Sequence, residues 1–119
     1  MSYDISLNDP VSKKVIEFQS AHQIAGGTVA IGGTTEAWLN VTYNYSDHFY
    51  RVLGKKGIRS IYGLTGAKAI PILEKAIIKL KDDYDDNDYW NPTEGNTKRA
   101  LCGLLAFAQM RPDGIFDGD

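Results

Sequence analysis

The stretch WLNVTYNYSDHFY, residues 38–50, decides how the rest of the chain is interpreted. Its first eight residues alternate with the period of two that is typical of a β-strand. One face of this strand carries the apolar and aromatic residues Leu39, Val41, Tyr43 and Tyr45, and the other carries Trp38, Asn40, Thr42 and Asn44. We expect the first face to pack in the core. We expect the second to be covered by a ligand, another subunit or a glycine-rich flap.

The segments before this stretch also read as β structure. Short runs at residues 3–7 and 14–19 flank a turn at Asn8, Asp9 and Pro10, which predicts a hairpin. A Gly-Gly-Thr unit at residues 26–28 recurs at residues 32–34 and brackets a short apolar strand. The two glycine pairs predict either two sharp turns or one mobile flap. The last and longest strand is predicted over residues 36–45.

Helical signals dominate the remainder of the chain. Ser46 is predicted to cap a short helix that ends at Gly54. A second helix is predicted over residues 67–82, where Pro71 must either mark the true start or cause a kink. A third helix follows Thr93 and ends at residues 111–112. The tail, residues 113–119, is rich in turn formers, with apolar residues at 115 and 116 that can pin it to the body.

Strands followed by helices predict an α+β fold: a small antiparallel sheet from the N-terminal third, packed against two or three C-terminal helices. No linker divides the 119 residues, so we expect a single domain over residues 1–119. Cys102 falls in the apolar pattern of the third helix and is predicted to be a small core residue.

The composition is that of an ordinary globular protein, with 43% hydrophobic and 24% charged residues. The net charge of −2 gives no electrostatic basis for binding bulk nucleic acid. The first residues lack the features of a signal peptide, and no apolar run reaches the length of about 20 residues that a membrane span needs. We therefore expect a cytoplasmic protein without a membrane partner.

The mixture of aromatic rings and amides in residues 38–50 is typical of sites that bind a planar polar ligand such as a nucleotide. The residues predicted to contact the base or ribose are Trp38, Asn40, Tyr43, Asn44, Tyr45 and His48. Lys56 and Arg59, from a basic and glycine-punctuated loop, are the candidates for phosphate. The alternative is a tyrosine-rich strand packed within the domain or at a dimer interface.

Catalytic and cofactor motifs are not evident in the sequence. His22 and His48 are the only histidines, and neither stands at a diagnostic spacing from a nucleophile, so we predict a protein that is not an enzyme and uses no cofactor. Residues 83–94 match the ligand positions of a calcium loop, but Asp88 occupies the position where that loop needs glycine. A solvated turn between two helices is the favoured interpretation of this segment.

Several blocks together resemble a group of small phage and prophage proteins. These blocks are residues 38–50, GIRSIYG at 57–63, DYW at 88–90, EGN at 94–96 and MRPDG at 110–114. The resemblance implies a phage origin and, by association, a role against bacterial defence. It implies no particular catalytic or binding residue.

We therefore expect a phage accessory protein in the host bacterial cytoplasm that binds a nucleotide-like immune signal and holds it without cleaving it. Such a sponge is expected to be a homo-oligomer. One alternative is an inhibitor that binds a host defence protein, as an anti-CRISPR protein does, through Tyr84, Asp85, Asp86 and Asp88. The other is a phage enzyme of unrecognised chemistry.

Overall fold

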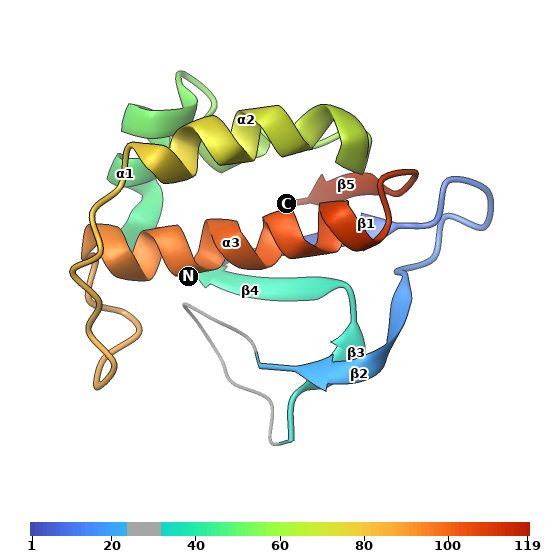
Figure 1. Cartoon of the computed structure of the whole chain (residues 1–119), viewed down its shortest axis with the longest axis horizontal. Coiled ribbons are helices and arrows are strands. Elements are labelled where there is room, and N and C mark those ends of the chain that lie inside the picture. Colours follow the sequence, from blue (N-terminus) through green and yellow to red (C-terminus); the bar gives the residue numbers. More distant parts are fainter. Residues whose placement is uncertain (24–31) are drawn as a thin grey trace.

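A computed structural model describes residues 1–23 and 32–119 of the chain (Figure 1). It is a mixed α+β structure, as the order of predicted elements indicated. In chain order the elements are β1 (Ser2–Asn8), β2 (Glu17–His22), β3 (Thr34–Glu36), β4 (Trp38–Thr42), η1 (Tyr43–Tyr45), α1 (Ser46–Leu53), η2 (Gly57–Ile61), α2 (Gly66–Ile78), α3 (Glu94–Met110) and β5 (Ile115–Gly118).

The main sheet has three antiparallel strands in the order β4-β1-β5, so its central strand is the first in the chain. Ile5 stands opposite Leu39 on one side, and Leu7 stands opposite Phe116 on the other. A second, two-stranded sheet pairs β2 with β3. This β2–β3 ribbon lies beyond β4, away from α2 (Figure 1).

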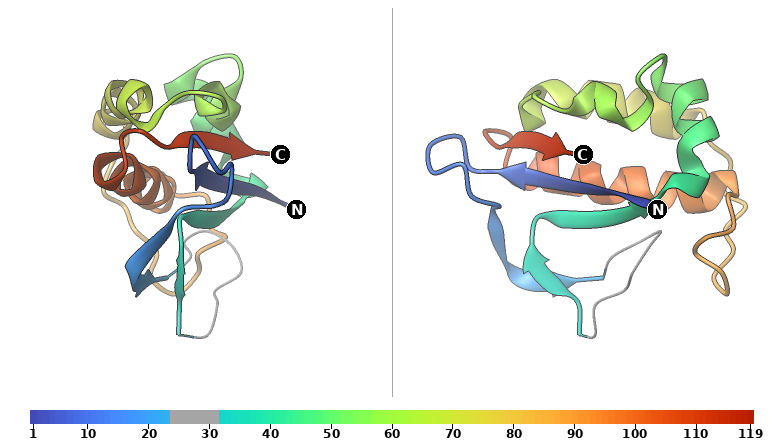
Figure 2. Two further views of the ribbon diagram at one scale, coloured as in Figure 1. Left: turned by 90° about the vertical axis from the view of Figure 1, so that its right-hand side faces the viewer. Right: turned by 180° about the vertical axis from the view of Figure 1, so that it is seen from behind.

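The helices α2 and α3 lie side by side on one face of the main sheet (Figure 2). On β1 and over most of β4, the strand residues that point toward them alternate with less buried ones, as a period of two requires. These buried residues are Tyr3, Ile5, Leu7, Leu39, Val41 and Phe116, and they belong to one hydrophobic cluster with the inward residues of the helices. The predicted inward position of Leu39 and Val41 is therefore confirmed.

The predicted third helix is confirmed as α3. Thr93 precedes it in an extended conformation, and the Thr93 hydroxyl accepts a hydrogen bond from the backbone amide of Asn96 at 3.0 Å. The helix α2 begins at Gly66, after a similar cap by Thr65, and continues through Pro71. It therefore starts one residue before the predicted residue 67, the alternative of a start near residue 70 is wrong, and its end at Ile78 falls short of the predicted residue 82.

The predicted strand over residues 36–45 is wrong at its C-terminal end. The strand β4 stops at Thr42, whose hydroxyl accepts from the backbone amide of Asn44 at 3.2 Å and caps a 3₁₀ turn. Ser46 is not a helix cap, because its hydroxyl donates to the carbonyl oxygen of Tyr43 and bonds the phenol of Tyr3. The local hydrogen bond that the Thr42 hydroxyl accepts therefore takes the place of the strand's backbone pairing from this point on.

The predicted hairpin forms only in part. The chain does turn back after β1, since Asn8 bridges Val15 and the amide of Ile16 donates to the carbonyl of Leu7 at 3.0 Å. It then leaves the main sheet, and β2 pairs with β3 instead of β1. The place beside β1 is taken by β5, in the tail that was predicted to be turn-rich.

Cys102 is exposed, so its predicted core position is wrong. It stands one residue after buried Leu101, and one step along a helix turns a side chain by about 100°, which carries Cys102 out of the core. The first Gly-Gly-Thr unit lies outside the described residues. In the part of the chain that the structure describes, no helix combines the length and the apolar character that a membrane crossing demands.

Candidate functional site

The outward face of β4 carries two of the residues predicted to bind a ligand. Trp38 and Asn40 are both partly exposed there. The Asn40 side-chain amide donates to the hydroxyl of Ser2 at 2.7 Å and to the carboxylate of Asp4 at 2.8 Å, both on the neighbouring strand β1. These bonds join Asn40 to its own sheet.

Three further predicted residues hold the segment between α2 and α3. The Asn44 amide donates to the carbonyl of Trp90 at 2.8 Å, and the Tyr45 phenol donates to the carbonyl of Tyr89. A ring nitrogen of His48 lies 2.8 Å from the carbonyl oxygen of Pro92. Burial raises the pKa of Tyr45 to about 12, so its hydroxyl stays protonated and keeps donating at neutral pH. These side chains support the fold.

Two of the remaining predicted residues, Tyr43 and Arg59, lie in another group around Tyr3. The Arg59 guanidinium stacks over the Tyr3 ring at 5.0 Å and donates to the Asp119 backbone carbonyl at 2.9 Å. Tyr43 packs edge-on against the same Tyr3 ring, with ring centres 4.5 Å apart. Lys56 is exposed. The eight predicted residues therefore form separate groups.

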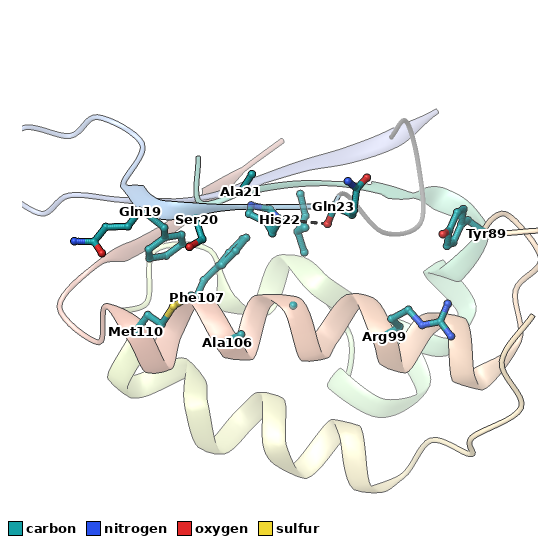
Figure 3. Close-up of a pocket in the computed structure, with 13 residues that line it drawn as sticks. Gln19, Ser20, Ala21, His22, Gln23, Tyr89, Arg99, Ala106, Phe107 and Met110 are labelled. Atoms are coloured by element: carbon teal, nitrogen blue, oxygen red, sulfur yellow. Dashed lines mark hydrogen bonds between the residues drawn. The ribbon is translucent and has the colours of Figure 1, made fainter. Parts of the chain in front are cut away.

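A cavity of about 720 Å³ lies elsewhere, between β2 and α3 (Figure 3). None of the eight predicted residues lines it. The lining residues come mainly from these two elements, and they are Phe18, Gln19, Ser20, Ala21, His22, Gln23, Leu39, Tyr89, Arg99, Gly103, Ala106, Phe107 and Met110. Figure 3 shows Arg99, Tyr89 and Gln23 toward one end of the cavity, and Met110 and Gln19 toward the other.

One face of α3 forms the floor of this cavity. Arg99, Gly103, Ala106, Phe107 and Met110 are spaced by four, three, one and three residues, which places them on one stripe of a helix. The stripe is narrow in its middle, where Gly103 and Ala106 have little or no side chain. A Cβ at Gly103 would lie only 3.0 Å from a methyl group of Leu39, so glycine lets the helix approach β4 closely.

Aromatic rings make the centre of the cavity. The ring of Phe107 lies between two rings of β2: its centre is 5.5 Å from that of Phe18 and 4.9 Å from that of His22, which meets it edge-on. A nitrogen of the His22 ring lies 2.7 Å from the Glu36 carbonyl oxygen on β3, which fixes the ring orientation. The site is therefore built across two elements that are distant in the sequence.

A single cation stands at one end of the cavity. Arg99 is the only lysine, arginine or carboxylate among the described lining residues. Its guanidinium lies 4.6 Å from the centre of the Tyr84 ring and pairs with the carboxylate of Asp86 at 2.8 Å. Stacking on Tyr84 orients the group, while the Asp86 side chain is 80% exposed.

The acidic segment before α3 uses its carboxylates within the fold. Asp83 accepts from the backbone amide of Gly95 at 2.8 Å, and Asp85 accepts from the Asn91 side chain at 2.9 Å. The Asn91 bond, with further backbone amides, holds the pKa of Asp85 below its usual value. Over residues 1–23 and 32–119, histidine, cysteine and carboxylate side chains form no cluster of three that would hold a metal ion.

In comparisons with known proteins, no family model matches this chain, and no curated protein or solved structure matches it either. The resemblance to phage proteins therefore stays a prediction.

Proposed function

We propose that this protein binds a small planar ligand in the cavity between β2 and α3 and holds it unchanged. The observation that carries the proposal is the cavity itself, whose volume of about 720 Å³ lies within the range of about 300 to 1,000 Å³ that small-molecule sites occupy. Its mostly apolar wall of aromatic rings with a few polar groups at the rim is also typical of such sites.

The nucleotide-like ligand expected from the sequence is a narrower version of this proposal. The rings of Phe18 and His22, both held against the buried ring of Phe107, offer surfaces on which a base can stack, and Arg99 offers one partner for a phosphate. A phage protein that opposes bacterial defence by binding an immune signal, without cleaving it, would need no catalytic group at this cavity. The immune signal, the phage origin and the homo-oligomer stay predictions.

Thermal unfolding in the presence of candidate ligands tests the proposal. The panel contains cyclic dinucleotides, ADP-ribose derivatives and planar aromatic acids. A ligand at 100 times its dissociation constant stabilises the folded state by about 2.7 kcal/mol, which raises the melting temperature by several degrees. The ligand should also be recovered intact after the complex is denatured, whereas an enzyme would release a product.

The substitution Ala106→Phe supplies the structural control, because it fills the floor of the cavity with a ring. The matched variant is Ala67→Phe, which places the same ring on an exposed position of α2. Ala106→Phe should abolish the thermal shift, and Ala67→Phe should preserve it. Equal shifts in both variants would show that the ligand binds elsewhere.

The alternative function, an inhibitor of a host defence protein, is favoured by one observation. Asn96 bonds the backbone of the acidic segment at Asp85 and Asp88, while the side chains of Tyr84 and Asp88 stay exposed. Against it, Asp82 and Asp86 pair with Lys98 and Arg99, which reduces the charge available to mimic a nucleic acid. Binding of a purified host protein that is lost in the Asp85→Ser, Asp88→Ser double variant would support this alternative.

A further inference from the structure

We infer that the cavity takes an elongated, mostly apolar molecule with one anionic group, and that the anionic group lies at Arg99. This inference rests on the proposed function, a ligand held in the cavity, and it favours a singly charged, mostly apolar ligand over the nucleotide-like one, whose two phosphates would meet only one cation among the described lining residues. Three features of the cavity lead to it: its length along α3, the apolar character of its middle, and the position of its one cation.

The length follows from the helix that forms the floor. Arg99 and Met110 are eleven residues apart on α3, and a rise of 1.5 Å per residue separates them by about 16 Å along the axis. Both residues line the cavity, and Figure 3 shows them toward opposite ends. A ligand that fills this space is therefore longer than a single ring.

The chemistry changes along that length. From Met110 to Gly103 the floor is apolar. The facing wall contributes Phe18 and Leu39, together with the polar residues Gln19, Ser20 and His22 of β2. Burying a ligand's hydrocarbon surface here stabilises the complex, since each buried methylene contributes about 0.8 kcal/mol. A second charge on the ligand's body would lose its hydration without gaining a charged partner among the described lining residues.

The guanidinium of Arg99 is oriented in a way that suits binding of an anion. Its guanidinium is oriented by the Tyr84 ring, and a planar guanidinium carries five N–H donors in a fork that matches a carboxylate. Its present partner, Asp86, is 80% exposed, and exposed ion pairs contribute little to stability. An anionic ligand can therefore take the place of Asp86 at small cost.

Two fluorescent probes of the same ring system separate charge from apolar shape. The anionic probe is 1-anilinonaphthalene-8-sulfonate, and the neutral probe is N-phenyl-1-naphthylamine, which lacks only the sulfonate. In the full chain, Arg99→Gln should raise the dissociation constant of the anionic probe roughly tenfold, as expected for loss of a hydrogen bond to a charged group. It should leave the dissociation constant of the neutral probe within about twofold.

Lys98→Gln is the matched control. Lys98 also ties α3 to the acidic segment, through an ion pair with Asp82 at 2.7 Å, but it does not line the cavity. This variant should bind both probes as the wild type does. Asp86→Asn removes the carboxylate that competes for Arg99, so it should lower the dissociation constant of the anionic probe. If Arg99 acted only by holding the acidic segment, Asp86→Asn would weaken that probe as Arg99→Gln does, and the inference would be overturned.

The failure of this inference is distinguishable from that of the proposed function. Binding of both probes that Ala106→Phe abolishes and Arg99→Gln leaves unchanged would overturn the anion site alone. Binding of neither probe to the wild-type chain would count against the cavity as a ligand site altogether. Should Arg99→Gln fail to fold, Arg99→Lys keeps the charge without the planar fork, and it should weaken the anionic probe by a smaller factor.

Discussion

Asn96 is a buried polar side chain whose bonds set the shape of the segment before α3. It is 2% exposed, its carbonyl oxygen accepts from the amide of Asp85 at 3.0 Å, and its amide group donates to the carbonyls of Asp88 and Asn91 at 3.0 and 3.1 Å. Each such bond contributes about 1 kcal/mol net. We expect Asn96→Ala to lower the free energy of unfolding by about 2 kcal/mol, measured by urea denaturation.

The control for this variant is Asn87→Ala in the same segment. Asn87 is exposed, and its bond to Asp85 uses the backbone amide, which alanine keeps. Its urea midpoint should stay close to that of the wild type. Equal midpoints for Asn96→Ala and Asn87→Ala would show that the buried amide does not organise the segment.

Tyr62 and Tyr3 differ in whether the phenol has a partner. The buried hydroxyl of Tyr62 makes no hydrogen bond within residues 1–23 and 32–119, whereas the Tyr3 hydroxyl lies 2.7 Å from that of Ser46. An unsatisfied buried hydroxyl costs about 1 kcal/mol or more. Urea denaturation at pH 7 should therefore show Tyr62→Phe neutral or stabilising by about 1 kcal/mol, and Tyr3→Phe destabilising by about the same amount.

Alkaline pH gives the Tyr62 variant a second readout. Burial, and then the nearby Asp119 carboxylate, raise the pKa of Tyr62 above its usual value of about 10. The unfolded chain therefore loses this proton first, and stability declines as the pH rises above about 10. The fall in urea midpoint from pH 8 to pH 11 should be smaller in Tyr62→Phe. An identical fall would mean that the Tyr62 phenol does not contribute to it.

At the level of elements, α2 is a helix that continues through an interior proline. It is capped at Thr65, and Pro71 lies inside it on the exposed side. Proline removes one backbone hydrogen bond and is about 3 kcal/mol less favourable than alanine in a helix interior. The inward residues Ala69, Leu73 and Ala76 are all buried, so tertiary packing maintains the helix despite Pro71.

We therefore expect Pro71→Ala to stabilise the protein by about 1 to 3 kcal/mol, since alanine restores the missing amide without touching the core. The measurement is the urea midpoint, with Glu74→Ala as the control at another exposed position of α2. The control should change stability by no more than about 0.5 kcal/mol. A less stable Pro71→Ala would indicate that the helix depends on the backbone conformation that proline fixes.

The elements differ in how far the sequence determined them. The helix α3 was predictable because Thr93 supplies a local cap and the apolar spacing is long and regular. The strand β5 was not, since Ile115 and Phe116 stand among glycines and aspartates and only their partners on β1 make them a strand. For β4, the local capping bond of Thr42 competed with the alternation that runs on to residue 45.

For the whole molecule, the fold class was predictable and the cavity was not. Strands before helices give an α+β arrangement from chain order alone. The cavity depends on how β2 docks on α3, and residues 18 and 107 are distant in the sequence. The signal that was available is the pair of small residues Gly103 and Ala106 within the apolar stripe of α3, which leaves space beside the large Phe107. In the aromatic stretch at residues 38–50, Asn44, Tyr45 and His48 bond backbone carbonyls of the segment between α2 and α3 and do not line the cavity.

The ring of Phe107 joins the β2–β3 ribbon to the rest of the molecule, and the last prediction follows from that. It is 3% exposed and packs against Phe18 and His22, and aromatic pairs contribute about 0.5 to 1.5 kcal/mol each beyond the area they bury. Phe107→Leu keeps an apolar side chain but removes both ring contacts. We expect the backbone amides of β2 to exchange hydrogen roughly tenfold faster in this variant, while the amides of β1 change much less.

Hydrogen exchange followed by mass spectrometry measures this difference, and Ile61→Val provides the comparison. Ile61 is fully buried on η2, and losing one methyl there costs about 1 kcal/mol. Because that cost falls on the main core, exchange should accelerate in β1 and β2 together. A ligand in the cavity should slow hydrogen exchange of the β2 amides in the wild type. The slowing should be smaller in Phe107→Leu, because Phe107 lines the cavity. Equal acceleration of β1 and β2 in Phe107→Leu would instead show that the ribbon and the main sheet open as one unit.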